Sequence, residues 1–329
     1  MTFATIRSPS SQYLAATDLL IGDMSDINYE FLILNRPIIL LANRWIRDNW
    51  PPIGHKTNME DLNEHIDLNI DKPFLFEKSR KEWLEKTFDM PFIGTSKRIL
   101  KIALNYSGIT TPELFFIHGG SEVRKTNLYP LYDEASQSRI RSNFVAFAPL
   151  QKKNNHIYFS AHYEDLPQKY IGFKIHLDHA PKGKGAANLK LSTDDYEKND
   201  YFPWIDLHIT AGKTGYSRTK LQLGPNFNRV VSGGYPKAEN ILKYNNESNK
   251  KSVFNEFGFN LQLPLITYAP AGYLSNAKPG GSLSEDILKK LFQISLKNQY
   301  NILIKYKANN LPIFKRAYIK IARKFYTKI

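Results

Sequence analysis

Residues 18–41 read DLLIGDMSDINYEFLILNRPIILL, and this stretch decides the fold class. The apolar run at 18–22 predicts a short buried strand, and the spacing of apolar residues at 24–34 is typical of a helix. A second apolar run at 36–43 predicts another strand. A strand, a helix and a strand in such quick succession form a βαβ unit, whose two strands are parallel. The sequence therefore predicts an α/β fold built on parallel strands.

Apolar runs and amphipathic segments alternate along the rest of the chain. Segment 133–150 changes from a helical to a strand-like pattern, and the glycine pair 119–120 follows a strand-like run. The polar stretch 245–252 is the best candidate for a linker. This alternation favours a doubly wound α/β architecture with two lobes. Further helices are predicted at 78–88, 94–108 and 282–298, and further strands at 156–161, 170–178, 206–212, 228–236, 263–272 and 300–309.

Length and composition narrow the class of protein. The 329 residues suggest two domains, at about 100–200 residues per domain. Hydrophobic and aromatic contents of 42% and 13% argue against disorder. The absence of cysteine excludes disulfides, thiolate metal sites and a cysteine nucleophile, and it fits a reducing compartment. The net charge of +14 predicts an anionic partner, which is a nucleic acid, an anionic membrane surface or a phosphorylated substrate.

Two features of the sequence bear on membranes. No cationic segment followed by an apolar region opens the chain, so no signal peptide is predicted, and no apolar run reaches the roughly 20 residues of a membrane span. Segment 312–329 has the pattern of a basic amphipathic helix. That pattern favours a helix packed on a sheet with a solvated basic face, and it also fits a helix on a membrane surface. Nucleic-acid binding is not predicted, because no reader motif accompanies the charge.

Asp23, Ser25 and Asp26 lie where the first predicted strand passes into its helix. Ligands of parallel sheets bind beyond the carboxyl ends of the strands. A helix N-terminus attracts phosphate through its free N–H groups and its dipole. The same residue types also cap helices. The pattern leaves both a phosphate site and a simple helix cap open.

Segment 174–185, KIHLDHAPKGKG, combines histidines, lysines and glycines. His176 and His179 flank Asp178, and Lys182 follows among glycines. An imidazole beside cations suits a base that acts near an anionic substrate. A surface turn with two ordinary histidines gives the same pattern, so both interpretations remain open.

Segment 208–215, HITAGKTG, contains the tripeptide GKT of phosphate-binding loops. The first glycine of such a loop belongs five residues before Gly212, where this chain has Leu207, so a P-loop is excluded. The lone H-x-x-H pattern at 176–179 is weak evidence for a metal, and no metal-ligand cluster is predicted.

Four segments together resemble the CDP-glycerol glycerophosphotransferase family, the teichoic-acid and capsule polymerases. The resemblance implies a GT-B arrangement, in which two Rossmann-like lobes face a cleft, and it spans most of the chain. The four are DLLIGDMSDINYEF with NRPIIL (18–40), similar to the family's D-x-S-S and K/R-P-I-I; DHAPKGKG (178–185), similar to H-G-x-P-x-K; VVSGGYPKAENIL (230–242), similar to G-Y-P-R-x-D-x-L; and LITYAPAG (265–272), similar to L-Y-A-P-T.

The order of these segments differs from the family's order. In the family the D-x-S-S segment comes last, whereas here its counterpart at 23–26 comes first and the others follow in family order. The resemblance therefore implies a circular permutation. Residues 251–329 and 1–120 would build the donor-nucleotide lobe, and residues 121–250 the acceptor lobe. A fragment of tandem modules, or exchange of segments between two copies, gives the same order.

The resemblance implies transfer of a phospho-alditol from CDP-glycerol or CDP-ribitol to a hydroxyl of a lipid-linked or polysaccharide acceptor. CMP is released, and neither a cofactor nor a metal is implied. His179 is expected to be the base, and Arg44 and Arg47 are candidates for acceptor contacts or for a structural loop. Lys307 stands where the family has a second histidine. The phosphates and nucleotide are expected to contact Asp23, Ser25, Asp26, Lys182, Tyr268, Ala269, Pro270, Ala271 and Lys307.

Two other functions remain open on the sequence. One is a GT-B glycosyltransferase with a nucleotide-sugar donor, and the other is a non-catalytic module that binds an anionic glycopolymer or a membrane. The transferase hypothesis places the protein in the cytoplasm, peripheral at the inner face of the plasma membrane, whose anionic leaflet suits the positive charge. A homo-oligomer formed by exchange of segments is compatible with the permuted order.

Overall fold

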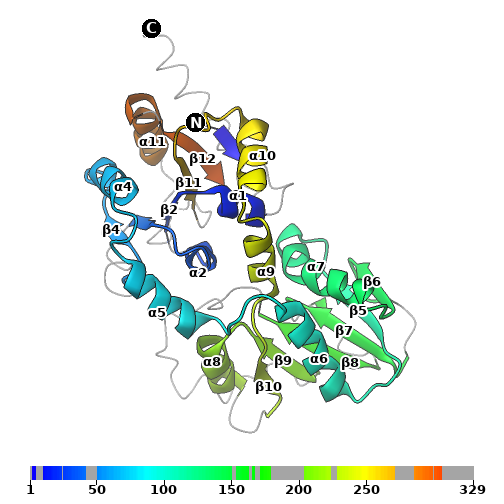
Figure 1. Ribbon diagram of the computed structural model, residues 1–329. Coiled ribbons are helices and arrows are strands. Elements are labelled where there is room, and N and C mark those ends of the chain that lie inside the picture. Colours follow the sequence, from blue (N-terminus) through cyan, green and yellow to red (C-terminus); the bar gives the residue numbers. More distant parts are fainter. Residues whose placement is uncertain are drawn as a thin grey trace. The chain divides into compact units, whose positions relative to one another are not determined.

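The computed structural model divides the chain into two compact units. The first unit comprises Met1–Trp83 and Ile241–Ile329, and the second comprises Leu84–Asn240. Each unit contains a six-stranded parallel sheet (Figure 1), so the prediction of an α/β fold with parallel strands is confirmed. The structure describes residues 2–4, 10–23, 25–41, 50–149, 153–162, 165–166, 171–178, 204–223, 228–270, 285–298 and 300–305.

The sheet of the first unit joins strands from both ends of the sequence. Its strand order is β1 (Thr2–Ala4), β12 (Asn301–Lys305), β11 (Leu265–Ala269), β2 (Leu19–Gly22), β3 (Ile38–Leu41) and β4 (His55–Thr57). The predicted βαβ unit is present, because β2 and β3 pair in parallel and α2 (Ile27–Leu32) connects them. Among the described residues, the further helices that lie wholly in this unit are α1 (Ser10–Ala16), α4 (Leu62–Asp71), α10 (Glu247–Phe257) and α11 (Glu285–Asn298).

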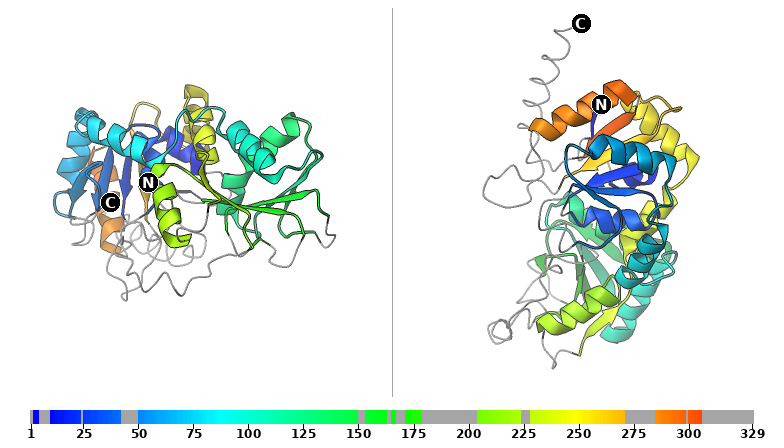
Figure 2. Two further views of the ribbon diagram at one scale, coloured as in Figure 1. Left: turned by 90° about the horizontal axis from the view of Figure 1, so that it is seen from below. Right: turned by 90° about the vertical axis from the view of Figure 1, so that its left-hand side faces the viewer.

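Helices cover both faces of this sheet (Figure 2). Alternate strand residues point to opposite faces, so Ile266 and Tyr268 of β11 pack with α4 and α11 in one hydrophobic cluster. Leu265 packs with α1 and α10 in another. The strands are therefore apolar on both faces, as a doubly covered parallel sheet requires.

The sheet of the second unit has the strand order β10 (Val230–Ser232), β9 (Leu207–Thr210), β8 (Phe173–Leu177), β7 (His156–Ser160), β5 (Glu113–Ile117) and β6 (Ser142–Val145). Helices α6 (Thr95–Ser107) and α7 (Glu122–Gln137) cover one face, and Phe116 and Phe159 lie in the cluster beneath them. Helix α8 (Lys213–Leu223) follows β9. Two helices cross the boundary between the units, α5 (Glu77–Thr87) and α9 (Pro236–Lys243).

The other face of this second sheet carries buried polar side chains. A parallel sheet that is covered on both faces usually reads as a continuous apolar run, but β7, β8 and β9 alternate polar and apolar residues. The polar members of this face are His156, Ser160, Lys174, His176, His208 and Thr210, each less than a tenth exposed. The same face also carries the apolar cluster of Phe115, Ile117 and Tyr158, so polar and apolar side chains are buried together there.

The expected boundary between the units at residue 120 is wrong. Residues 84–120 contribute α6 and β5 to the second unit. The glycine pair at 119–120 misled the prediction, because both glycines have positive φ and form the turn between β5 and α7. A strand-to-helix turn uses the same glycine signal as a linker.

The polar stretch at 245–252 is also not a linker. It begins α10, whose N-cap is Asn246, and the Asn246 side chain accepts a hydrogen bond from the backbone N–H of Asn249 at 3.0 Å. Asparagine favours this capping position because its side-chain oxygen satisfies a free N–H of the first turn. The exposed face of a capped helix accounts for the polarity.

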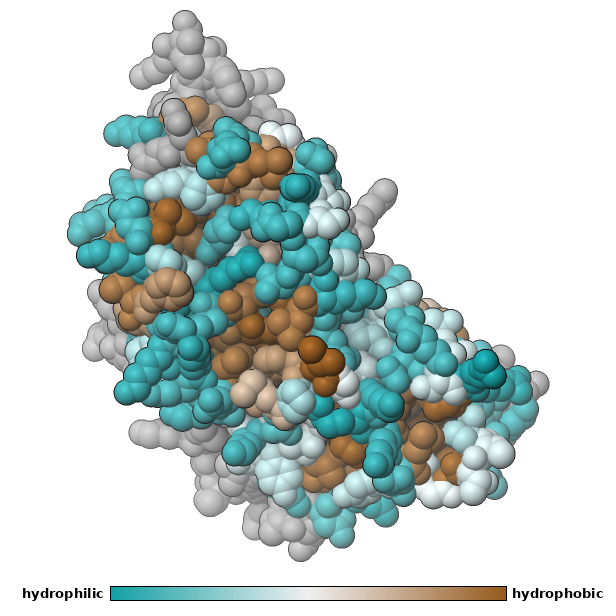
Figure 3. All heavy atoms as spheres, in the orientation of Figure 1, coloured by the Kyte–Doolittle hydropathy of each residue, from teal (hydrophilic) through white to brown (hydrophobic). Residues whose placement is uncertain are grey.

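The surface mixes hydrophilic residues with separate hydrophobic patches on the face shown in Figure 3. Among the described residues, no helix combines the length and the apolar character that crossing a membrane demands. The basic segment 312–329 lies outside the described residues.

Two histidines make the free energy of unfolding depend on pH. Burial lowers the pKa of His55 and of His156 below the ordinary value of 6.5, and the neighbouring His65 lowers that of His55 further. The unfolded chain therefore binds protons more readily at these sites than the folded chain does. Their contribution to stability is complete above pH 6.5 and is lost as pH falls from there toward the lower folded pKa.

We expect the urea midpoint to fall between pH 7 and pH 5, and to fall less in the double variant His55→Gln/His156→Gln. Urea unfolding at pH 5, 6 and 7 measures this difference. An identical pH slope in the variant and the wild type would assign the acid sensitivity to other groups.

Candidate functional site

The three strands that lead into predicted site segments end at the carboxyl edge of the first sheet. In the pairing of β11 with β2, Ala269 lies opposite Gly22, and in that of β11 with β12, Tyr268 lies opposite Ile304. Asp23 and Pro270 are the first residues after β2 and β11, and Lys305 is the last residue of β12. Carboxyl ends of neighbouring parallel strands share one edge, where α/β proteins bind their ligands.

The turn after β2 is held by Asn28. The side-chain Nδ2 of Asn28 donates a 2.6 Å hydrogen bond to the carbonyl of Asp23, and Asp23 is 1% exposed. A Cβ at Gly22 would lie 1.8 Å from Asn28 Oδ1, so only glycine fits there. The buried side-chain amide of Asn28 therefore fixes the path of the backbone at Gly22 and Asp23.

Ser25 and Asp26 begin α2 as the capping interpretation expected. Ser25 Oγ accepts a hydrogen bond from the backbone N–H of Ile27 at 3.5 Å, and Asp26 is the N-cap residue, without a capping hydrogen bond from its side chain. Burial raises the pKa of Tyr29, and the Asp26 carboxylate raises it further. Tyr29 therefore stays protonated across the ordinary pH range.

Tyr268 does not fit its expected role as a nucleotide contact. Its side chain is fully buried in the hydrophobic cluster beneath α4 and α11. The strand period explains this position, because Tyr268 shares its face of the sheet with Ile266. Ala269 and Pro270 are buried at the end of the same strand.

Six predicted site residues lie outside the described residues. They are Arg44, Arg47, His179, Lys182, Ala271 and Lys307. Their neighbours in the chain are described: Asp178 precedes His179 and lies just beyond β8, and Pro270 precedes Ala271 just beyond β11.

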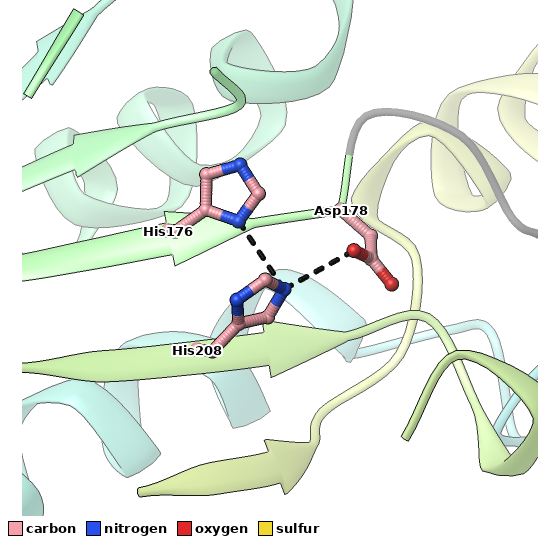
Figure 4. A group of neighbouring side chains, drawn as sticks. All are labelled: His176, Asp178 and His208. Atoms are coloured by element: carbon pink, nitrogen blue, oxygen red, sulfur yellow. Dashed lines mark hydrogen bonds and ion pairs between the residues drawn. The ribbon is translucent and has the colours of Figure 1, made fainter. Parts of the chain in front are cut away.

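A second group of chemistry-bearing side chains lies in the second unit. His176 on β8 lies opposite His208 on β9 in the parallel pairing, and Asp178 follows the end of β8 (Figure 4). The Nε2 atom of His208 is 3.2 Å from His176 Nδ1 and 3.2 Å from Asp178 Oδ1. All three residues are buried, and their ligand atoms lie within 4.8 Å of one another.

Arg218 of α8 completes this group. Its Nη2 atom is 3.8 Å from Asp178 Oδ1, and its side chain is also buried. Four buried polar atoms here have no hydrogen-bond partner among the residues that the structure describes: Asp178 Oδ2, His208 Nδ1, Arg218 Nε and Arg218 Nη1. An unsatisfied buried polar atom costs about 1–3 kcal/mol, so their concentration at one place is unusual for a purely structural cluster.

The prediction that the chain lacks a metal-ligand cluster is therefore corrected. In the sequence, His176 lies near His179 in one segment, whereas His208 lies in a distant segment that contains the tripeptide GKT. The alternating pattern of β8 and β9 does place His176 and His208 on one face of each strand. The pairing of the two strands, which brings the two imidazoles together, is set by tertiary structure and is not visible in the sequence.

A cavity in the second unit has a different place. Its volume is about 880 Å³, and its lining includes Glu113, Arg141 and Asn155, at the amino ends of β5, β6 and β7. Glu113 pairs there with Arg141 at 3.0 Å. This is the edge of the sheet opposite to His176 and Asp178, and no predicted site residue lies in it.

The described residues thus form an α/β fold with two groups of polar residues at strand ends. Comparison with protein-family models, with curated proteins and with solved structures finds no match.

Proposed function

We propose that this chain is a phospho-alditol transferase of GT-B type whose segments are circularly permuted. It moves glycerol phosphate or ribitol phosphate from a CDP-alditol to a hydroxyl of a lipid-linked or polysaccharide acceptor. The acceptor oxygen attacks the β-phosphorus, the diphosphate bond breaks, and CMP leaves with the bonding electron pair.

The observation that carries the proposal is the shared edge of β2, β11 and β12. Parallel pairing brings the ends of these strands together, and the segments that resemble the family's donor-binding motifs follow those ends. The three segments are far apart in the sequence, at 23–26, 268–271 and 305–307. A nucleotide site assembled from separate strand ends is the arrangement that α/β sheets favour.

The second unit supplies the proposed base. His179 directly follows Asp178, which lies at the carboxyl end of β8. In the proposal His179 takes the proton of the acceptor hydroxyl, while Lys182 and Lys307 neutralise the diphosphate. The net charge of +14 suits an anionic polymer and an anionic leaflet, so we place the reaction at the inner face of the plasma membrane.

The test is release of CMP from CDP-glycerol and CDP-ribitol, with a polyol-phosphate acceptor and with UDP-sugars as competing donors. We expect CMP from one CDP-alditol and a loss of at least about 100-fold in His179→Ala, the contribution typical of a general base. Lys307→Gln should weaken donor binding.

Matched control variants separate these effects from general damage. His65→Ala changes a histidine of α4 that contacts Thr57 of the edge strand β4, not β2, β11 or β12. Lys251→Gln removes an exposed charge of α10, and both variants should retain wild-type turnover. Turnover of UDP-sugars alone would replace the proposal with a glycosyltransferase. Salt-dependent binding of anionic polymer without any turnover would replace it with a non-catalytic module.

A further inference from the structure

We propose that His176, Asp178 and His208 bind one divalent late transition-metal ion of the Zn²⁺ type. The inference concerns the second unit alone and does not depend on the transferase proposal. It uses the only group of potential metal ligands that converges among the described residues.

Two of the three ligand spacings match a metal site. In a tetrahedral zinc site with bonds of about 2.0–2.1 Å, the ligand atoms lie about 3.3 Å apart. Here Nε2 of His208 lies 3.2 Å from both Nδ1 of His176 and Oδ1 of Asp178 (Figure 4). All three ligand atoms lie within 4.8 Å of one another, and adjustment of the His176 and Asp178 side chains would let one ion contact all of them.

Hydrogen bonding alone satisfies this arrangement only weakly. An imidazole nitrogen has one position in the ring plane, which holds either a proton or a lone pair. If His208 Nε2 carries the proton, this single N–H must be shared between Asp178 Oδ1 and the lone pair of His176 Nδ1. If Nε2 carries the lone pair, it can accept from His176 but then faces an ionised Asp178 oxygen. A cation removes this conflict, because it attracts all three lone pairs at once.

The backbone fixes the ligands before any ion binds. His176 and His208 are held in register on adjacent strands, and the backbone N–H of Asp178 donates to the carbonyl of Ile209 at 3.1 Å. Ligands on paired strands lose little conformational freedom on binding, which favours a tight site.

The surrounding polar atoms also indicate a missing ligand. Asp178 is less than a tenth exposed, and within the described part of the chain its Oδ2 atom has no hydrogen-bond partner. Two imidazoles and one carboxylate are a common donor set for Zn²⁺ and related ions, and they leave a coordination position open for water or an anionic group. Arg218 lies beside that carboxylate, 3.8 Å from Oδ1, and its charge would both repel the ion and attract an anion.

The experiment measures metal binding by the full chain without donor or acceptor substrate. The protein is treated with a chelator, dialysed and titrated with Zn²⁺ and with Co²⁺, and the absorption spectrum of Co²⁺ reports its coordination. We expect one equivalent of either ion and a Co²⁺ spectrum typical of nitrogen and oxygen ligands. His208→Gln and Asp178→Asn should each weaken binding by about 100-fold or more.

Two further variants separate loss of the metal site from loss of the folded structure. His65→Gln, in the other unit, should bind metal as the wild type does. Arg218→Met should bind Zn²⁺ more tightly than the wild type, because it removes a positive charge beside the ligand carboxylate. A merely destabilising substitution would not tighten binding, so this result holds even if His208→Gln fails to fold.

Sub-stoichiometric binding by the wild type, or affinity unchanged in folded His208→Gln, would overturn the site. Failure of the CMP-release assay leaves this result unaffected, since no substrate enters the titration. Conversely, a titration in which no ion binds would overturn the metal site alone and leave the transferase proposal to the CMP-release assay.

Discussion

Phe116→Ala is expected to lower the free energy of unfolding of the second unit by about 3–5 kcal/mol, the range for truncating a buried phenylalanine. Phe116 is fully buried on β5. Its ring stacks on that of Phe159 with centroids 4.9 Å apart and meets Tyr132 of α7 edge-on. Truncation leaves a cavity under α6 and α7 that the neighbouring strands cannot close, because the sheet pairing holds them apart.

Amide hydrogen exchange shows which strands lose stability in Phe116→Ala. Peptides from β5 and β7 should lose protection, whereas peptides from β11 in the first unit should keep theirs. Tyr106→Ala is the matched control, since that ring on α6 is 49% exposed and its removal should cost under about 0.5 kcal/mol. Equal loss of protection in both units would show that the two compact units unfold as one.

The fold class follows from local sequence, and residues 18–41 show why. A parallel strand that is buried on both faces must be apolar throughout. The runs LLIG (19–22) and IILL (38–41) can therefore be identified as strands before their partner strands are known. The helix between them is shorter than the apolar spacing at 24–34 predicted: α2 comprises Ile27–Leu32. Ser25 and Asp26 belong to its cap, which the residue types had allowed.

The boundaries between the units were harder to predict from the sequence, because glycines and polar runs occur in turns and helix caps as well as in linkers. Gly119 and Gly120 looked like a linker but form a turn within the second unit, and the polar run at 245–252 is a capped helix. Whether such a segment is a linker or part of one unit depends on contacts across the sheet. Such contacts join residues far apart in the sequence, and local composition does not encode them.

The candidate sites show the same limit. The strand ends at Asp23 and Pro270 were predictable, because loops that follow buried strands are where ligands bind. The juxtaposition of His176 with His208 was not, because it depends on which strands pair and in which register. Tyr268 is buried because of the face of β11 on which it lies. The segment LITYAPAG alone does not show which face that is, because the strand register is not known from the sequence.

Gly22→Ala is expected to destabilise the first unit by about 3 kcal/mol, combining overpacking of about 1–3 kcal/mol with loss of a buried hydrogen bond. The new Cβ would lie 1.8 Å from Asn28 Oδ1, so the amide must move. Asn28 is fully buried, and its movement breaks the 2.6 Å hydrogen bond to the carbonyl of Asp23. Urea unfolding followed by circular dichroism measures the loss.

A double-mutant cycle tests whether this contact is the cause. Asn28→Ala alone removes the hydrogen bond and should cost about 1–2 kcal/mol, but it also removes the atom that clashes with residue 22. Gly22→Ala/Asn28→Ala should therefore be less destabilised than the sum of the two single variants. Ser25→Ala is the control in the same turn, because its 3.5 Å capping contact is long and its removal should cost about 0.5 kcal/mol. Additive losses would mean that Asn28 does not confine residue 22, and that the chain path past Asp23 is set by some other contact.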